Sequence, residues 1–320
     1  MPRGQADIPV RYQARRQNID GNLTVPGSSR IVGGAVPSSL KLIKKDKIYV
    51  KHNDDKNNCL ISGLDITVNG SIILADLLNC KIKFVSPEGL LLSSLAQHEI
   101  PIDVAVINKS EAAVSMKNKQ ISIIDIADSS HLSLKRIIKT EQYVWCITVY
   151  NNNLVIACYT SGDSPRSVQM IDMRGKVLWT TTTDSEGKNL FDCAWYLTTC
   201  SSDDGDMVIV TDVKKQTITV LDASTGKVVK VCDVKGKKPV GVTVDDNGNV
   251  FVCYWSGEIT VWSRDMQEET RLITVSEYLK YPWAMAYNRR RSELVLTSST
   301  NNTDYCDFIH RFRISIMQYK

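Results

Sequence analysis

The stretch Gly63-Leu-Asp-Ile-Thr-Val-Asn-Gly-Ser-Ile-Ile-Leu-Ala-Asp76, continued by Leu-Leu-Asn-Cys-Lys-Ile-Lys-Phe-Val-Ser-Pro-Glu-Gly89, alternates apolar runs with turn residues. It predicts a strand, an Asn-Gly turn, a second strand that ends in Asp, a tight turn and a third strand. The same order recurs at residues 196–212 and again at residues 241–254. Because self-similarity at a fixed period is the signature of repeat architectures, this stretch predicts one unit of a repeat fold.

Six such units follow one another at a nearly constant spacing. Aligning the first strand of each unit places equivalent positions 40, 43, 50, 45 and 43 residues apart, at Gly63, Asp103, Cys146, Tyr196, Gly241 and Ala284. This period is typical of the four-stranded blades of a β-propeller. From Leu40 onward the apolar residues alternate with a period of two, and no long amphipathic helix is indicated. The sequence therefore predicts an all-β fold, a six-bladed β-propeller with four-stranded antiparallel blades.

The two ends of the chain predict how the ring closes. The sixth unit contains only three strand-like runs, whereas residues 40–50 form an extra lysine-rich run ahead of the first unit. Placed as the outer strand of the last blade, this run completes the blade and joins the two ends of the propeller. The lysines suit an exposed outermost strand. We therefore expect a propeller over residues 40–320, closed by an N-terminal strand.

Residues 1–39 show no sustained periodicity and mix Arg, Gln, Gly, Pro and Ser, which predicts a disordered basic arm. The first 40 residues contain five arginines and two aspartates, so they carry +3 of the net charge of +4. The remaining chain is therefore nearly neutral. Such a body attracts polyanions weakly at long range, and nucleic-acid binding would need a local basic patch.

Composition also indicates the cellular compartment. No apolar run approaches the roughly 18 residues of a membrane span, and residues 1–7 lack the apolar segment of a secretory signal. The nine cysteines are an odd number, and Cys158, Cys232 and Cys253 lie in apolar strand-like runs. Reduced thiols in the core of a cytoplasmic protein are therefore expected.

Several segments resemble the NHL-repeat propeller of tripartite-motif (TRIM)-like proteins of molluscan and other invertebrate type. They are Lys56-Asn-Asn-Cys-Leu-Ile-Ser-Gly-Leu-Asp65, Asp76-Leu-Leu-Asn-Cys-Lys-Ile-Lys83, Gln142-Tyr-Val-Trp-Cys-Ile-Thr-Val149 and Val168-Gln-Met-Ile-Asp-Met-Arg-Gly-Lys-Val177. The resemblance covers about residues 40–315. It implies an NHL-like propeller that recognises a protein, such as a ubiquitination target, or single-stranded RNA.

The chain lacks the other modules of that family. It contains no Cys-x-x-Cys pair, no Cys/His series and no long heptad segment, so neither a RING, nor a B-box, nor a coiled coil is predicted. Ubiquitin-ligase activity would require a RING outside these residues. We expect either a stand-alone propeller or a fragment of a longer ligase.

Aromatic residues and lysines are expected to gather on one face of the ring. Loops that enter the inner strands share this face with the turns between second and third strands. The ligand-binding residues predicted there are Tyr143, Trp145, Trp195, Tyr254, Trp255, Trp283, Lys117, Lys119 and Lys214. Such a surface suits a protein or peptide as a hot spot, or unpaired bases as a stacking platform. The near-neutral body favours a protein, although some rings are equally expected to fill gaps between blades.

These observations predict a non-catalytic recognition module, with no enzyme activity, no cofactor and no metal. One alternative is a single-stranded RNA binder. Another is a metal-dependent hydrolase or lyase, for which Asp65 and Asp103 are the main calcium ligands to consider. Both carboxylates, however, are expected to bond backbone groups. Asp76 and Asp212, which end second strands, are expected to accept backbone N–H groups in the turns that follow.

Overall fold

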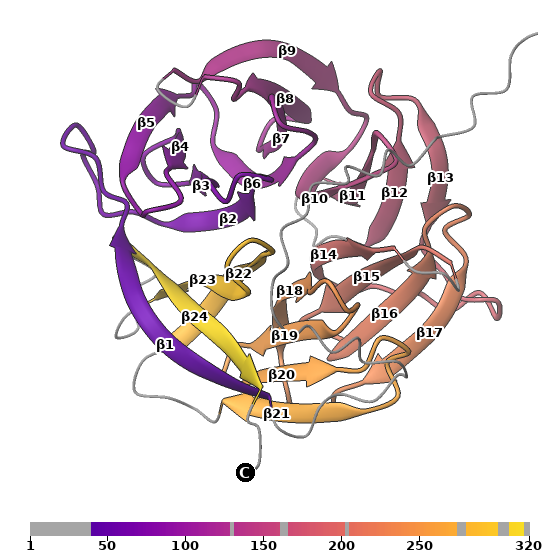
Figure 1. The fold of residues 1–320 in the computed structure, drawn as a ribbon. Helices are drawn as coiled ribbons and strands as arrows, with labels where there is room; N and C mark the ends of the chain where they lie inside the picture. Colours follow the sequence, from indigo (N-terminus) through magenta and orange to yellow (C-terminus); the bar gives the residue numbers. More distant parts are fainter. Residues whose placement is uncertain are drawn as a thin grey trace, which may run out of the picture. The chain divides into compact units, whose positions relative to one another are not determined.

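The structure is a computed structural model that describes residues 40–128, 131–160, 166–201, 205–273, 280–299 and 307–316. In these residues the chain forms 24 strands in six four-stranded antiparallel sheets, and it forms no helix. The sheets are arranged as blades around a central axis (Figure 1). The predicted six-bladed β-propeller is thereby confirmed. The arm predicted at residues 1–39 lies outside the described residues.

The strands fall into four classes by their distance from the axis. The inner strands are β2 (Ile61–Ile66), β6 (Pro101–Val106), β10 (Tyr143–Tyr150), β14 (Ala194–Cys200), β18 (Pro239–Val244) and β22 (Lys280–Asn288). The second strands are β3 (Ile72–Asp76), β7 (Glu111–Met116), β11 (Asn153–Tyr159), β15 (Met207–Asp212), β19 (Val250–Tyr254) and β23 (Glu293–Ser299). The third strands are β4 (Lys81–Val85), β8 (Gln120–Asp125), β12 (Ser167–Ile171), β16 (Thr217–Asp222), β20 (Ile259–Trp262) and β24 (Phe308–Ile316). The outer strands are β5 (Leu91–Ala96), β9 (Ser133–Lys139), β13 (Val177–Thr181), β17 (Val228–Asp233), β21 (Glu269–Ile273) and β1 (Leu40–Tyr49).

Burial follows this order because each sheet is covered on both faces by its neighbours. Every residue of β3, β4, β19 and β20 is buried, which explains the nearly continuous apolar sequences of β3, β19 and β20. The outer strands β5 and β17 instead alternate between partly buried and exposed residues. Among the described residues, no helix has the length and apolarity needed to cross a membrane.

The N-terminal strand closes the ring as predicted. Strand β1 pairs antiparallel with β24, from Leu40 opposite Ile316 to Tyr49 opposite Phe308, and so completes the last blade (Figure 1). Its Lys41, Lys45 and Lys47 are exposed, as expected for an outermost strand. The blade is therefore built from both ends of the propeller sequence, and its sheet hydrogen bonds hold the ring shut.

A buried ion cluster anchors the segment that leads from β1 into the first blade. The fully buried Nζ of Lys83 lies 2.5 Å from Oδ2 of Asp55 and 2.7 Å from Oδ2 of Asp76. It also donates to the carbonyl of Val50 at 2.9 Å and lies 3.1 Å from Sγ of Cys59. Burial by itself lowers the pKa of Lys83, but the carboxylates outweigh it and the pKa is raised. The lysine is therefore held in its charged form.

The two aspartates that end second strands both bond backbone groups, but the expected bonds to backbone N–H groups of the following turn are found at Asp212 and not at Asp76. Asp76 accepts the backbone N–H of Leu60 at 3.1 Å and also bonds Lys83. Asp212 accepts the backbone N–H groups of Asp192, Cys193, Lys214 and Lys215, all between 2.7 and 2.9 Å. Each carboxylate thus joins the turn after its strand to the segment that enters its blade.

Candidate functional site

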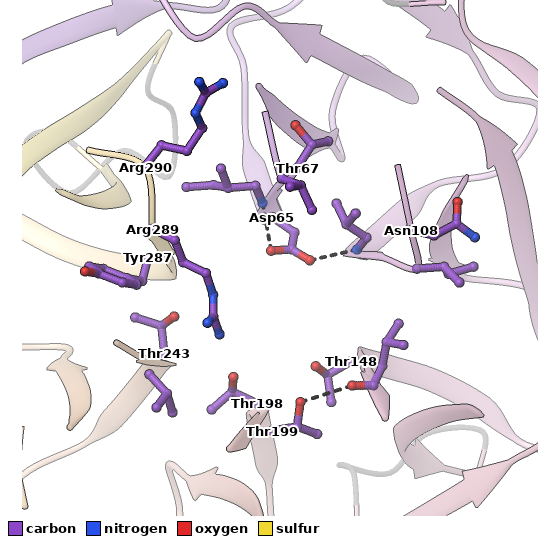
Figure 2. A pocket seen from close by; sticks show the side chains of 16 residues that line it. Asp65, Thr67, Asn108, Thr148, Thr198, Thr199, Thr243, Tyr287, Arg289 and Arg290 are labelled. Atoms are coloured by element: carbon purple, nitrogen blue, oxygen red, sulfur yellow. Dashed lines mark hydrogen bonds between the residues drawn. The ribbon is translucent and has the colours of Figure 1, made fainter. Parts of the chain in front are cut away.

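A pocket of about 560 Å³ opens at the end of the ring where the inner strands finish. All six inner strands contribute to its wall, together with the turns that follow β2, β6 and β22 (Figure 2). The polar residues of the wall are Asp65, Thr67, Asn108, Thr148, Thr198, Thr199, Thr243, Tyr287, Arg289 and Arg290. A volume of this size is typical of sites for small molecules. We call this space the central pocket.

A second, smaller cavity of about 60 Å³ adjoins the central pocket, and the two share Asp65, Thr148, Thr198 and Thr243 in their walls. The smaller cavity is also lined by Asp103 and Tyr196. Its volume exceeds the roughly 15 Å³ that one water molecule needs, but it is too small for a sugar-sized molecule. We call it the inner cavity.

One tier of equivalent residues explains why these walls are polar. The positions two residues beyond the aligned positions of the six inner strands are Asp65, Ala105, Thr148, Thr198, Thr243 and Ala286, and all six line the inner cavity. In every blade the register between the inner strand and the second strand shifts near the aligned position, just before this tier. In β2, for example, the shift lies between Ile61 and Gly63. The shared irregularity gives every blade the same register, so three threonines and one aspartate face the axis.

Asp65 is the carboxylate common to both spaces. Its Oδ1 accepts the N–H of Ile66 at 2.7 Å, and its Oδ2 accepts the N–H of Val106 in the next blade at 2.7 Å. Burial raises the pKa of Asp65 to about 6, although the two N–H groups and Arg289 act in the opposite direction. At neutral pH this carboxyl is mostly ionised and can accept a proton.

Asp103 makes the equivalent link one blade further on. Its Oδ1 accepts the N–H of Val104 and its Oδ2 accepts the N–H of Ile147 in β10, both at 2.9 Å. Burial raises the pKa of Asp103 to about 7, and the charge of Asp65 acts in the same direction. The expectation that both carboxylates bond backbone groups is confirmed. Their titration near neutral pH could not be read from the sequence, because it depends on burial in the assembled ring.

Two arginines in the β22–β23 turn lie at the edge of the central pocket. Figure 2 shows the side chain of Arg289 reaching from the edge toward the middle, whereas Arg290 points away from it. Nη1 of Arg289 lies 2.9 Å from Oδ1 of Asp246, and Nη1 of Arg290 donates to the carbonyl of Asn69 at 2.9 Å. Arg289 therefore brings a positive charge to the pocket whose wall also contains the half-buried Asp65.

The residues around the axis do not fit a metal centre. Asp65 and Asp103 each bond two backbone N–H groups, and among the described residues they belong to no group of three His, Cys, Asp or Glu ligand atoms close enough to share an ion. Within the described part of the chain, one group of three His, Cys, Asp or Glu ligand atoms lies close enough to share an ion, namely Asp55, Cys59 and Asp76. That group surrounds the ammonium of Lys83, which takes the place of a cation.

The aromatic residues predicted from the sequence lie at the opposite end of the ring, where the inner strands begin. The indole of Trp195 contacts that of Trp145 at a centroid distance of 4.9 Å and that of Trp283 at 5.5 Å. Trp255 continues the series, 5.7 Å from Trp283. All four side chains are partly exposed. The structure thus gathers the four tryptophans into one continuous cluster, which we call the tryptophan cluster.

The remaining predicted residues are distributed less evenly. Lys119 lies over the ring of Tyr143 at 5.2 Å, and Tyr143 stacks on Tyr159 beside the tryptophan cluster. Lys117 and Lys214 are exposed in turns between second and third strands. Tyr254, in contrast, is fully buried and bonds Glu269 at 3.2 Å, so its ring offers no face to a ligand. Its place at the end of a buried second strand accounts for this difference.

The sequence analysis did not identify Thr148, Thr198, Thr243 or Arg289 as site residues. The threonines carry a signal that could have been used, since they stand two residues after equivalent positions in three successive units. Arg289 carries no such signal. Its approach to the pocket depends on the turn after β22, whose Arg-Arg-Arg sequence at residues 289–291 is not repeated in the equivalent turns of the other units.

Comparison with known families identifies one match. Residues 197–300, from within β14 to the end of β23, match the family described as the SMP-30/Gluconolactonase/LRE-like region. Comparison with curated proteins gives no match. The family match covers about a third of the chain and, together with the six blades, supports a propeller family. It does not confirm the NHL or TRIM-like type.

This match corrects the prediction that the chain has no enzyme activity. A gluconolactonase is a lactone-hydrolysing enzyme, so the matched family includes hydrolases. The prediction was wrong because it looked for histidines or several carboxylates converging as metal ligands. The pocket is instead assembled from residues about 40 positions apart, among them five threonines that carry no catalytic signature in sequence. The chain is a six-bladed β-propeller whose residues 197–300 are similar to the SMP-30/gluconolactonase-like region.

Proposed function

We propose that this protein is a hydrolase of small esters or lactones that acts in the central pocket. The observation that carries the proposal is the presence of two carboxyl groups, Asp65 and Asp103, in the wall of one cavity; burial raises the pKa of Asp65 to about 6 and that of Asp103 to about 7. Carboxyl groups with pKa values raised toward neutral pH suit a general base and a general acid. The family match at residues 197–300 supports the same class of reaction.

The proposed reaction uses the chain's own groups to move protons. Ionised Asp65 takes a proton from a water molecule whose oxygen attacks the carbonyl carbon of the substrate. The bond from this carbon to the ester oxygen then breaks, and protonated Asp103 supplies a proton to the departing oxygen through water in the inner cavity. The product is a hydroxy acid when the substrate is a lactone. Proton exchange with solvent restores both carboxyl groups.

The threonine tier suits the charge that develops during this reaction. In the described part of the protein, the hydroxyl groups of Thr148, Thr198 and Thr243 have no hydrogen-bond partner, and all three line both spaces. Hydroxyl donors that face a pocket can stabilise the oxyanion formed when water attacks a carbonyl. They can also bond the hydroxyl groups of a substrate.

The proposal is tested by assaying purified protein against five- and six-membered sugar lactones and simple aryl esters. Asp65→Asn is expected to lower kcat by about 100-fold, the usual size of a general-base contribution. Asp233→Asn is the matched control, because Asp233 is exposed on the outer strand β17. Absence of hydrolysis above the uncatalysed rate by folded protein would refute the proposal, as would an Asp65→Asn variant with wild-type activity.

A second function, binding of a protein partner, is supported by the tryptophan cluster at the other end of the ring. Four partly exposed indoles in contact, next to Tyr143 and Lys119, have the composition of an interaction hot spot. The resemblance to NHL propellers of TRIM-like proteins supports a peptide or protein such as a ubiquitination target. The eight described cysteines are free, which is compatible with a cytoplasmic location.

This second function is tested by affinity capture with wild type and with Trp145→Ala plus Trp283→Ala. Loss of specific partners from the double variant would support the tryptophan cluster as the contact surface. Equal capture by both proteins would refute it. A steep fall of affinity with salt concentration would instead indicate single-stranded RNA as the ligand, because phosphate contacts release counterions.

A further inference from the structure

We infer that the central pocket selects small, hydroxylated molecules that carry an acidic group, a carboxylate or a phosphate, and that Arg289 binds this group. The inference deepens the proposed function by naming its substrate class, since it concerns the same pocket. It depends on three features of the pocket wall: the direction and free donors of Arg289, the arc of threonines, and the position of Arg289 at the edge of the pocket, outside the inner cavity that Asp65 and Asp103 line.

Arg289 has the geometry of an anion-binding residue at the edge of a pocket. Its side chain reaches toward the middle of the opening (Figure 2), and its contact with Asp246 is made through one nitrogen, Nη1. A guanidinium has five N–H donors in a planar fork, so donors remain for a second acid. The contact with Asp246 is also exposed at both partners, 71% at Arg289 and 48% at Asp246. Exposed pairs of this kind contribute about 0–1 kcal/mol, so a bound acid can compete with it.

The threonine arc supplies recognition of hydroxyl groups. Thr148, Thr198 and Thr243 occupy the same tier of three successive blades, and Thr199 and Thr67 lie further out in the same wall. Thr199 donates to the carbonyl of Val149 and Thr67 donates to that of Ser71, so these two hydroxyls offer acceptors only. The hydroxyls of Thr148, Thr198 and Thr243 can each donate and accept a hydrogen bond, which matches the alcohol groups of a polyol. The apolar wall residues Val106, Val149 and Val244 offer no such partner. The wall is therefore suited to a polyhydroxylated molecule more than to a plain aliphatic ester.

The positions of the charges decide the orientation of the molecule. Asp65 lies in the shared wall of the two spaces, and Asp103 lies in the inner cavity, whereas Arg289 stands in the turn at the edge. Repulsion from Asp65 excludes an anionic group from the inner end, and attraction by Arg289 holds it at the outer end. The ester or lactone carbonyl is then directed inward, toward the carboxyl groups that move protons.

The test measures binding and needs no turnover. Isothermal titration calorimetry of the purified chain would compare glucuronate and glucose 6-phosphate with glucose as the neutral probe. The two acids are expected to bind at least about 10-fold more tightly than glucose, the ratio that one charge-assisted hydrogen bond supplies. Preference for glucuronate alone would assign a carboxylate, preference for the phosphate would assign a phosphorylated molecule, and both results support the inference. Equal affinities for acid and neutral probes would overturn it.

Matched variants locate the interaction. Arg289→Ala is expected to abolish the preference for the acids while leaving glucose binding unchanged, whereas Arg313→Ala, an exposed arginine on β24, is the control. Thr198→Val is expected to weaken all three probes by about 3- to 10-fold, the range for one neutral hydrogen bond. Thr180→Val on the exposed strand β13 is its control. An Arg289→Ala variant that keeps the acid preference would overturn the inference.

The outcomes of this test and of the hydrolase assay are separable. Acid-selective binding without hydrolysis of any lactone or ester would refute the proposed function and leave the inference standing. Hydrolysis that shows no preference for acidic substrates, with equal binding of the three probes, would refute the inference and leave the hydrolase standing.

Discussion

Gly63 and Asp103 are packed so closely that a Cβ atom on Gly63 would overlap Oδ1 of Asp103 and lie 2.5 Å from its Cα. The two residues occupy equivalent positions in adjacent inner strands, β2 and β6. The absence of a side chain at Gly63 therefore lets the strands approach, and this approach holds the Asp103 carboxylate over the backbone of the next blade. A glycine in the repeat stretch thus positions a carboxyl group of the inner cavity.

Replacing Gly63 by alanine is expected to destabilise the propeller by about 1–3 kcal/mol, because the added methyl group overpacks the contact with Asp103. Denaturant unfolding measures this change. Gly236→Ala is the control, since Gly236 has open space around it and a φ of 77°, so its cost is confined to backbone conformation, about 1 kcal/mol. A Gly63→Ala protein as stable as wild type would show that β2 and β6 can separate freely.

Hydrolysis is expected to follow a bell-shaped pH profile with its maximum between about pH 6 and pH 7. Activity falls at lower pH because Asp65, with a pKa of about 6, becomes protonated and cannot accept a proton. It falls at higher pH because Asp103, with a pKa of about 7, loses the proton it must donate. The measurement is kcat against pH. In Asp103→Asn the descending alkaline limb should disappear, whereas an unchanged profile would exclude Asp103 as the acid.

Replacing Lys83 by methionine is expected to cost about 3–5 kcal/mol of unfolding free energy, because it leaves the buried Asp76 without its cation and Asp55 paired with Lys81 alone. Lys235→Met is the control, since Lys235 is 88% exposed. Chemical denaturation at neutral pH gives the comparison. A loss below about 1 kcal/mol would mean that other groups already compensate the two carboxylates.

The same cluster predicts a loss of stability in acid. Burial alone raises the pKa of Asp55, but hydrogen bonds from Lys81 and Lys83 outweigh it, and the pKa is lowered. A carboxyl whose folded-state pKa is depressed stabilises the fold above its unfolded pKa, about 3.9, and this contribution is lost as pH falls below that value. Unfolding free energy measured from pH 6 to pH 2 should therefore fall less steeply in Asp55→Asn than in wild type.

Deleting residues 40–51 is expected to destabilise the whole ring, because this removes β1 from the last blade and leaves β24 as an unpaired edge. The deletion also removes the Val50 carbonyl that Lys83 bonds. Hydrogen exchange should report faster exchange in all six blades. Faster exchange confined to β22, β23 and β24 would show that closure is not required for the rest of the ring.

The number of blades, their strand order and the closing strand could be read from the sequence, because each depends on local periodicity. Apolar alternation in segments such as residues 63–89 specifies strands and turns within a few residues, and its repetition counts the blades. The structural roles of Asp76 and Asp212 could be predicted for the same reason, since each bonds backbone groups near its own turn or blade entry.

The site depended on tertiary structure. Asp65, Thr148, Thr198 and Thr243 are far apart in sequence and meet because the inner strands close around one axis with the same register. The direction of Arg289 and the burial that raises the pKa values of Asp65 and Asp103 exist only in the closed ring. Tyr254 shows the converse: the sequence predicted that its ring lies on the binding surface, whereas in the structure the residue is fully buried. By itself, therefore, the sequence determined the repeating scaffold through local periodicity, whereas ring closure decided which side chains share a pocket and which of them titrate near neutral pH.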